Sequence, residues 1–159
     1  MKKWIFTIAA MLLFFAANAQ DGRSIYNKYS DEKDVSAVFI SPSMFKMIGK
    51  LPEITVDGNE KVDITPIVST LKGFYMLSAS DKGTINRLNN DVKRLLDSGS
   101  YELMIEAKEK GESFRIYTDG DDKIIRSLVM MATEGSEATF ISMDGLINRE
   151  ALERLITSN

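Results

Sequence analysis

Two side chains one helical turn apart form the clearest catalytic pattern in the sequence. Ser43 and Lys46 match the S-x-x-K arrangement, in which a lysine amine takes the proton of a serine nucleophile. Enzymes that use this arrangement also need a K-T-G motif on a strand, and the sequence contains none. A helix start explains the same residues, with Ser41 as the cap and Lys46 in solvent. A hydrolase that uses Ser43 and Lys46 is therefore a remote alternative.

Two further patterns contain atoms that could bind metals. Met44 and Met47 could offer thioethers to Cu(I), but two ligands do not complete a site, and methionines at this spacing are typical of core packing. The Asp119-Gly120-Asp121-Asp122 segment places three carboxylates in one loop, and calcium takes such ligands. It lacks the spacing of an EF-hand, and a hairpin turn explains Asp-Gly. We therefore expect no metal and no cofactor.

The composition excludes several classes of function. The chain has 159 residues without histidine or cysteine, which excludes Ser-His-Asp catalysis, ordinary zinc sites, disulfides and a cysteine-linked lipid anchor. The formal net charge is −3, and it becomes −5 without the two lysines of residues 1–19. An acidic chain without a basic run is a poor partner for nucleic acid.

The first 19 residues have the pattern of a signal peptide. Lys2 and Lys3 precede an apolar run from Trp4 to Ala17, and Ala17-Asn18-Ala19 supplies the small residues of a cleavage site. The run is shorter than the about 20 apolar residues of a spanning helix. We expect cleavage after Ala19, which leaves one domain over residues 20–159. That domain should be exported, periplasmic or secreted, and soluble, without a stable membrane anchor.

Apolar spacing predicts the elements of the first half of this domain. A helix over 23–30 and a strand over 35–40 precede a helix that starts at Ser41-Pro42 and ends near Gly49. Residues 51–62 are predicted to be a polar connection. Asp63 is then expected to cap a short helix over 66–71, before a strand over 73–78 and a helix over 84–97.

The second half predicts a four-stranded meander and a last helix. The strands are expected at 101–108, 112–118, 124–132 and 138–143, and Asn148 is expected to cap the helix. The element order favours an α+β domain. We expect a mixed, largely antiparallel sheet of about six strands, with helices packed mainly on one face.

The first hairpin of the meander has a predictable register. A two-residue turn at Lys110-Gly111 pairs Glu109 with Glu112, Ala107 with Phe114 and Ile105 with Ile116. On the other face, it pairs Glu106 with Arg115 and Met104 with Tyr117. We expect the helices to cover the face that carries Ile105.

The next strand extends the face opposite the helices. The Asp119-Gly120 turn allows two registers, one of which adds Leu128 and Met130 to this face, whereas the other adds Val129 and Met131. We take the first register. It predicts an interaction patch of adaptable apolar side chains formed by Met104, Tyr117, Leu128 and Met130.

Beyond Ser127, the strand over 124–132 is apolar on both sides, which predicts cover on both faces. That cover comes from the chain itself, or from an unknown envelope protein or a second copy. We therefore expect a non-enzymatic protein-binding module of the cell envelope. The alternative is a small domain that binds or carries an apolar ligand, which would need a concave apolar pocket between sheet and helices.

Several segments resemble a known family. They are the Tyr29-Ser30 helix end, Val38 to Phe45, the Leu71-Lys72-Gly73 step, Tyr101 to Met104 and Met143-Asp144-Gly145. Over nearly the whole chain beyond residue 19, the sequence resembles a Bacteroidota family of exported proteins, domain of unknown function 4252. The resemblance implies export and a link to envelope regulation, because some members are encoded near regulators of the extracytoplasmic sigma-factor type. Some members are lipoproteins, but this chain lacks the cysteine. No activity is known for the family, so no catalytic residue is implied.

Overall fold

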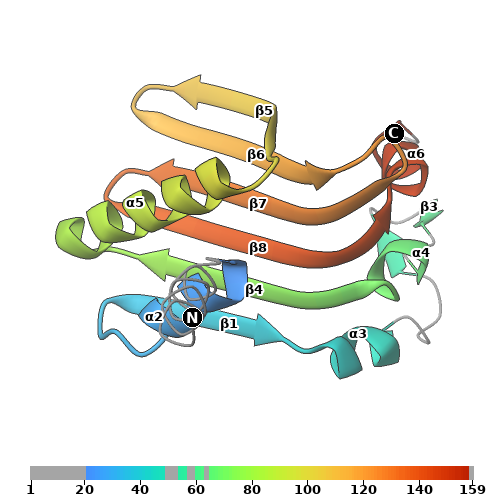
Figure 1. Ribbon diagram of the computed structural model, residues 1–159, viewed down its shortest axis with the longest axis horizontal. Helices are drawn as coiled ribbons and strands as arrows, with labels where there is room; N and C mark the ends of the chain where they lie inside the picture. The colour runs from blue at the N-terminus through green and yellow to red at the C-terminus, as the bar shows by residue number, and fades with distance from the viewer. Residues whose placement is uncertain (1–20, 49–53, 57–59, 63–64, 158–159) are drawn as a thin grey trace, which may run out of the picture.

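The computed structural model describes residues 21–48, 54–56, 60–62 and 65–157 (Figure 1). The predicted signal peptide, Gly49, Asp63 and parts of the predicted polar connection over 51–62 lie outside these ranges. The described helices are α2 (Gly22–Tyr29), α3 (Pro42–Ile48), α4 (Thr65–Val68), α5 (Lys82–Ser98) and α6 (Arg149–Thr157). The main strands are β1 (Val35–Ile40), β4 (Leu71–Ala79), β5 (Glu102–Glu109), β6 (Glu112–Gly120), β7 (Ile124–Glu134) and β8 (Glu137–Asn148).

The six main strands form one sheet in the order β1-β4-β8-β7-β6-β5, in which every neighbouring pair is antiparallel. This arrangement confirms an α+β fold, but the prediction that the sheet is mixed is wrong. The segment predicted as a polar connection contains a separate two-stranded hairpin, β2 (Ile54–Val56) with β3 (Glu60–Val62). β8 continues past the predicted end at residue 143 and reaches α6 without a break.

Local signals in the sequence explain where the helices begin. Asp21 and Asp81 accept hydrogen bonds from the backbone N–H groups of Ser24 (2.7 Å) and Thr84 (2.9 Å) at the starts of α2 and α5. Ser41 and Asn148 accept from Met44 (3.3 Å) and Ala151 (3.0 Å), as their predicted capping roles require.

The main core lies between the sheet and two helices. On one face of the sheet, Leu77, Val129 and Phe140 are buried against α2 and α5. We call this the α5 face. Figure 1 shows both helices on the same side of the sheet. The opposite side is the reverse face, which carries Met76, Met130 and Ile141 because side chains alternate along a strand. Ile105 belongs to the reverse face, so the expectation that helices cover its face is wrong.

A second, smaller core closes one end of the reverse face. Phe45 of α3, Leu71, Ile125 and Ile147 are buried there, with Ile67 and Val68 of α4 and Leu152 of α6 packed around them. The ladder is irregular at this end, where the register shifts between Leu71 and Gly73 and between Ile125 and Ser127. Such irregularities bend strands. The bent end brings α3, α4 and α6 onto the face that α2 and α5 leave uncovered.

A charged group buried at the joint of α2 and α5 fixes the two helices to each other. The carboxylate of Asp91 accepts a hydrogen bond from the Tyr29 hydroxyl at 2.7 Å, and it pairs with Lys28 at 2.5 Å and with Arg94. Burial alone would raise the pKa of Asp91, but the hydrogen bonds from Lys28 and Tyr29 bring it below its usual value. Asp91 is therefore a buried anion whose partners come from both helices.

Candidate functional site

The structure gives the S-x-x-K pair no catalytic setting. Ser43 and Lys46 are both exposed on α3, and neither lines a described cleft. Met44 and Met47 are also exposed on this helix, at 47% and 65%, so the prediction that they belong to its buried face is wrong. The buried residue of this part of the helix is Phe45.

The carboxylates of the Asp119–Asp122 segment serve the turn. Asp121 accepts the backbone N–H groups of Lys123 and Ile124, each at 2.9 Å, and these two bonds lower its pKa. Its other oxygen is 3.1 Å from Arg126, which also lies 4.0 Å from Asp119. No group of three or more possible metal-ligating side chains is found in the described part of the chain.

The four residues of the predicted interaction patch lie on two faces. Tyr117 pairs with Val129 on the α5 face, whereas Leu128 and Met130 lie on the reverse face. The register across the Asp119-Gly120 turn is therefore the alternative one, and the prediction that the four share one surface is wrong. Met104 falls at a register shift between Leu103 and Ile105, so Leu103 takes the expected place opposite Tyr117. The other pairs predicted for this hairpin are confirmed.

The reverse face carries an apolar row in continuous register. It crosses all six strands through Val38, Met76, Ile141, Met130, Ile116 and Ile105. None of these residues belongs to either apolar cluster of the described residues. Val38 and Ile105, at the two ends of the row, are 45% and 49% exposed, and the four between them are half-buried. Phe114 and Ala132, which face each other one row away, widen the apolar surface.

Four glutamates border this surface at the hairpin end. Glu109 faces Glu112 across the β5–β6 turn, and Glu134 faces Glu137 across the β7–β8 turn. Three of them surround a shallow depression floored by Phe114 and Ala132, and an adjoining depression is lined by Glu134 and Glu137. None of the four forms an ion pair within the described ranges. The rim is therefore negative, although Lys108, which pairs with Glu106, also lines the first depression.

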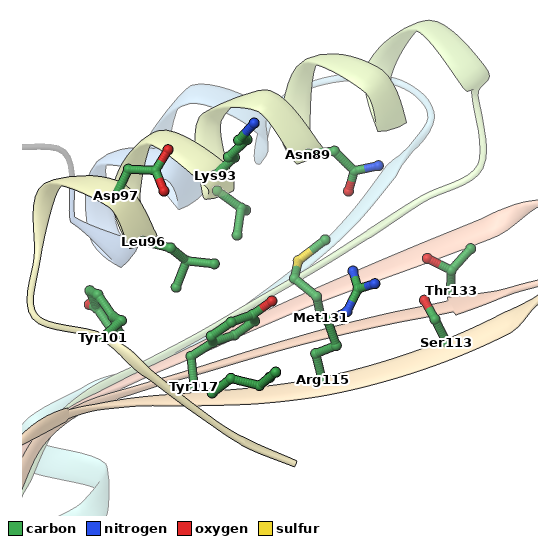
Figure 2. A pocket seen from close by; sticks show the side chains of 12 residues that line it. Asn89, Lys93, Leu96, Asp97, Tyr101, Ser113, Arg115, Tyr117, Met131 and Thr133 are labelled. Carbon is green, nitrogen blue, oxygen red and sulfur yellow. The ribbon is translucent and has the colours of Figure 1, made fainter. Parts of the chain in front are cut away.

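A cleft of about 620 Å³ lies on the α5 face. The flank of α5 forms one wall, and the parts of β5, β6 and β7 that extend beyond the helix form the other (Figure 2). It is lined by Asn89, Val92, Lys93, Leu96, Asp97, Tyr101, Leu103, Ser113, Arg115, Tyr117, Met131 and Thr133. Its size is within the range of small-molecule sites.

One ion pair orients the main cation of the cleft. Arg115 donates from Nε to Glu106 Oε2 at 2.5 Å, and Lys108 holds the other oxygen of Glu106 at 3.0 Å. The Arg115 bond, with a smaller contribution from Lys108, lowers the pKa of Glu106. The described hydrogen bonds of Arg115 use Nε and leave its two Nη atoms facing the cleft side of the strand.

A half-buried tyrosine closes the opposite end of the cleft. The Tyr101 hydroxyl is 3.0 Å from Ser127 Oγ, and burial raises the pKa of Tyr101. Tyr101 therefore presents its ring to the cleft, while its hydroxyl is hydrogen-bonded to Ser127 below the cleft. Its position follows from the chain, because Tyr101 stands between the end of α5 and the start of β5.

Sequence reasoning missed both surfaces. The Glu106–Arg115 pair was predictable, but nothing indicated that it faces α5. The residues Asn89, Val92, Lys93 and Leu96 follow helical spacing and mark one flank of α5, which was the available signal for the cleft wall. The reverse-face row required the order of strands in the sheet, which the sequence did not supply.

The fold and its surfaces define an α+β domain with one helix-lined cleft and one apolar sheet face. A family model described as "Domain of unknown function (DUF4252)" matches residues 29–155, and the chain belongs to this family. No curated protein and no solved structure is similar enough to count as a match. Among the described residues, no helix has the length and apolar character needed to cross a membrane.

Proposed function

We propose that this protein is a non-enzymatic, exported module of the cell envelope, which binds an apolar, basic segment of another protein on its reverse face. The observation that carries the proposal is the apolar row from Val38 to Ile105, which is in register across six strands. Burying such side chains is favourable by about 25 cal/mol per Å² of apolar surface. The absence of histidine and cysteine from the chain supports a role in binding over one in catalysis.

The size of the surface favours a single segment as the occupant. Six strands span about 24 Å at a spacing of about 4.8 Å, and successive rows on one face are about 7 Å apart. The second core already fills the row of Phe74 and Met143. The remaining surface is a few hundred Å², whereas stable interfaces between whole proteins bury about 800 Å² on each partner. A helix about 10 Å wide matches this surface better than a second copy does.

The charge of the rim indicates the chemistry of that segment. Glu109, Glu112, Glu134 and Glu137 border the hairpin end without cationic partners among the described contacts. Lysine or arginine at one end of the bound segment would compensate them, and such complementarity fixes the orientation of a partner. The opposite end of the surface is closed by α3, α4 and α6.

Residues on the two faces of β5 offer a matched test. Ile105 and Leu103 are 49% and 50% exposed, but Ile105 lies on the reverse face and Leu103 on the α5 face. A photo-crosslinking amino acid is placed at position 105 or 103 of the full chain in the cells that make it. We expect position 105, and not 103, to give an adduct with a second envelope protein. Mass spectrometry should assign the crosslink to an amphipathic peptide with basic residues.

Two results would contradict the proposal. An adduct between two copies of this chain would show that the reverse face is a homodimer interface, and no adduct at position 105 would show that it binds no protein. The Met130→Glu substitution should abolish the adduct from position 105, because partner binding would bury the new carboxylate in an apolar contact.

A further inference from the structure

The strand wall of the cleft beneath the flank of α5 changes from polar to apolar along its length. On the strands, Ser113 faces Thr133, Arg115 faces Met131, and Tyr117 faces Val129 in three successive rows. On the helix, the lining residues pass from Asn89 through Val92, Lys93 and Leu96 to Asp97, so polar and apolar side chains alternate along this wall. Figure 2 shows Asn89, Ser113 and Thr133 together at one end, and Leu96, Tyr101 and Tyr117 together at the other.

The polar end has the donors that an anionic group needs. Asn89 offers an amide, Ser113 and Thr133 offer hydroxyls, and Arg115 offers guanidinium N–H groups. Because Glu106 holds Arg115 through Nε, the guanidinium is fixed beside the cleft. Arginine in a fixed position is well suited to a carboxylate, which can accept two of its N–H groups. Lys93 also lines the helix wall, but its amine points away from the strands (Figure 2).

The apolar end has the features of a site for a hydrocarbon chain. Leu96, Tyr101, Leu103 and Tyr117 enclose it, and Met131 lies between the two ends. Methionine and aromatic side chains adapt to flexible apolar ligands. Residues 89 to 97 of α5 span about 12 Å along the helix axis. An extended chain of about ten carbons has a comparable length. Asp97 lies at this end, away from the donors, and would repel a ligand bound in the reverse orientation.

We infer that this cleft binds a single-chain amphiphile with an anionic head, of the medium-chain fatty acid type. The head lies against Arg115, Ser113 and Thr133, and the chain extends toward Tyr117 and Leu96. No residue of the apolar row on the reverse face lines this cleft, although Ser113 and Thr133 at its polar end also line the depression bordered by Glu109, Glu112 and Glu134. The inference therefore stands or falls independently of the proposed protein partner.

Two adjacent methionines provide the readout. Met131 lines the cleft, whereas Met130 belongs to the reverse face. The protein is labelled with ¹³C at the methionine methyl groups and titrated with decanoate below its micelle concentration, in parallel with decanol and decyltrimethylammonium. Met131→Leu and Met130→Leu assign the two signals. We expect decanoate to shift the Met131 methyl saturably and to leave the Met130 methyl unchanged. Decanol and the cationic amphiphile should bind at least tenfold more weakly.

Variants test the head-group end. Arg115→Gln should weaken decanoate binding at least tenfold and leave decanol binding unchanged. Arg126→Gln is the matched control, because Arg126 pairs with Asp121 at the turn and does not line the cleft. Ser113→Ala combined with Thr133→Val tests the same end without disturbing the Glu106 ion pair. It should weaken decanoate binding severalfold even if Arg115→Gln does not fold. An unmoved Met131 signal, equal binding of decanoate and decanol, or a Met130 shift at the same concentration would each overturn the inference.

Discussion

At the scale of single residues, Asp91 matters most for the joint between α2 and α5. Asp91→Asn keeps the shape and removes the charge that Lys28 and Tyr29 contact. We expect a loss of about 1 to 2 kcal/mol in the free energy of unfolding. The loss is limited because the Lys28 and Arg94 side chains are 51% and 68% exposed and regain water. Urea denaturation measures it, and Asp97→Asn on the same helix serves as the control. Equal effects of the two changes would contradict a special role for Asp91.

The same residue predicts a dependence of stability on pH. The folded-state pKa of Asp91 is lowered, so its contribution is complete above the unfolded value of about 3.9 and is lost as the pH falls through the folded value. The wild-type chain should therefore lose this part of its stability below about pH 4. Asp91→Asn lacks the titrating group, so its stability should fall less steeply between pH 4 and pH 2. Parallel curves for the two proteins would assign the acid sensitivity to other carboxylates.

Removal of one buried hydroxyl, that of Thr118, should stabilise the protein. Thr118 is 4% exposed, and its Oγ1 has no hydrogen-bond partner among the described residues. Thr118→Val keeps the branched shape and removes the unpaired group, so we expect a gain of about 1 kcal/mol in the free energy of unfolding. Urea denaturation of the two proteins measures the gain. A loss of stability would indicate that a water or an undescribed segment satisfies this hydroxyl.

At the scale of elements, the β5–β6 hairpin carries a strained turn. Lys110 has φ of 47° and Gly111 has φ of 88°, and two-residue turns with both central residues in this region favour Asn-Gly. Lys110→Asn should therefore stabilise the protein by about 0.5 to 1 kcal/mol. The thermal midpoint measures the gain. Lys108→Asn, two residues earlier on β5, is the control. It should not raise the midpoint, because asparagine is disfavoured in strands. An unchanged midpoint for Lys110→Asn would show that the turn is not strained.

The elements themselves were largely predictable, whereas their faces were not. Apolar spacing and turn residues located β1, α2, α5 and the first hairpin within two residues. The assignment of residues to the two faces of the sheet failed because β6 and β7 are apolar on both sides. In β6, Ile116 is followed by Tyr117, and in β7, Met130 is followed by Met131. A slip of one residue at Gly120 moves each strand residue to the other face. The register shifts at Asp119–Gly120 and Leu103–Ile105 depend on tertiary contacts that no local pattern indicates.

At the scale of the whole molecule, one bent sheet serves two cores on opposite faces. β4, β7 and β8 contribute buried residues to both, through Leu77 and Leu71, Val129 and Ile125, and Phe140 and Ile147. The two cores therefore lie at different positions along the same strands. This arrangement leaves the middle of the reverse face uncovered by the described helices and extends β5 and β6 beyond α5. Both candidate surfaces follow from the way in which a few short helices cover a long sheet.

We expect the fold to need neither a bound metal nor a cross-link. A domain of this size buries about two-thirds of the surface of its unfolded chain and needs no cross-link to be stable. The chain has no cysteine, and Asp121 already satisfies backbone N–H groups and pairs with Arg126. Thermal midpoints should therefore agree within about one degree among buffer alone, EDTA, a reductant and millimolar calcium. A ligand that binds only the folded state raises the midpoint, so a rise of several degrees with calcium, lost in Asp122→Asn, would restore the 119–122 loop as a calcium site.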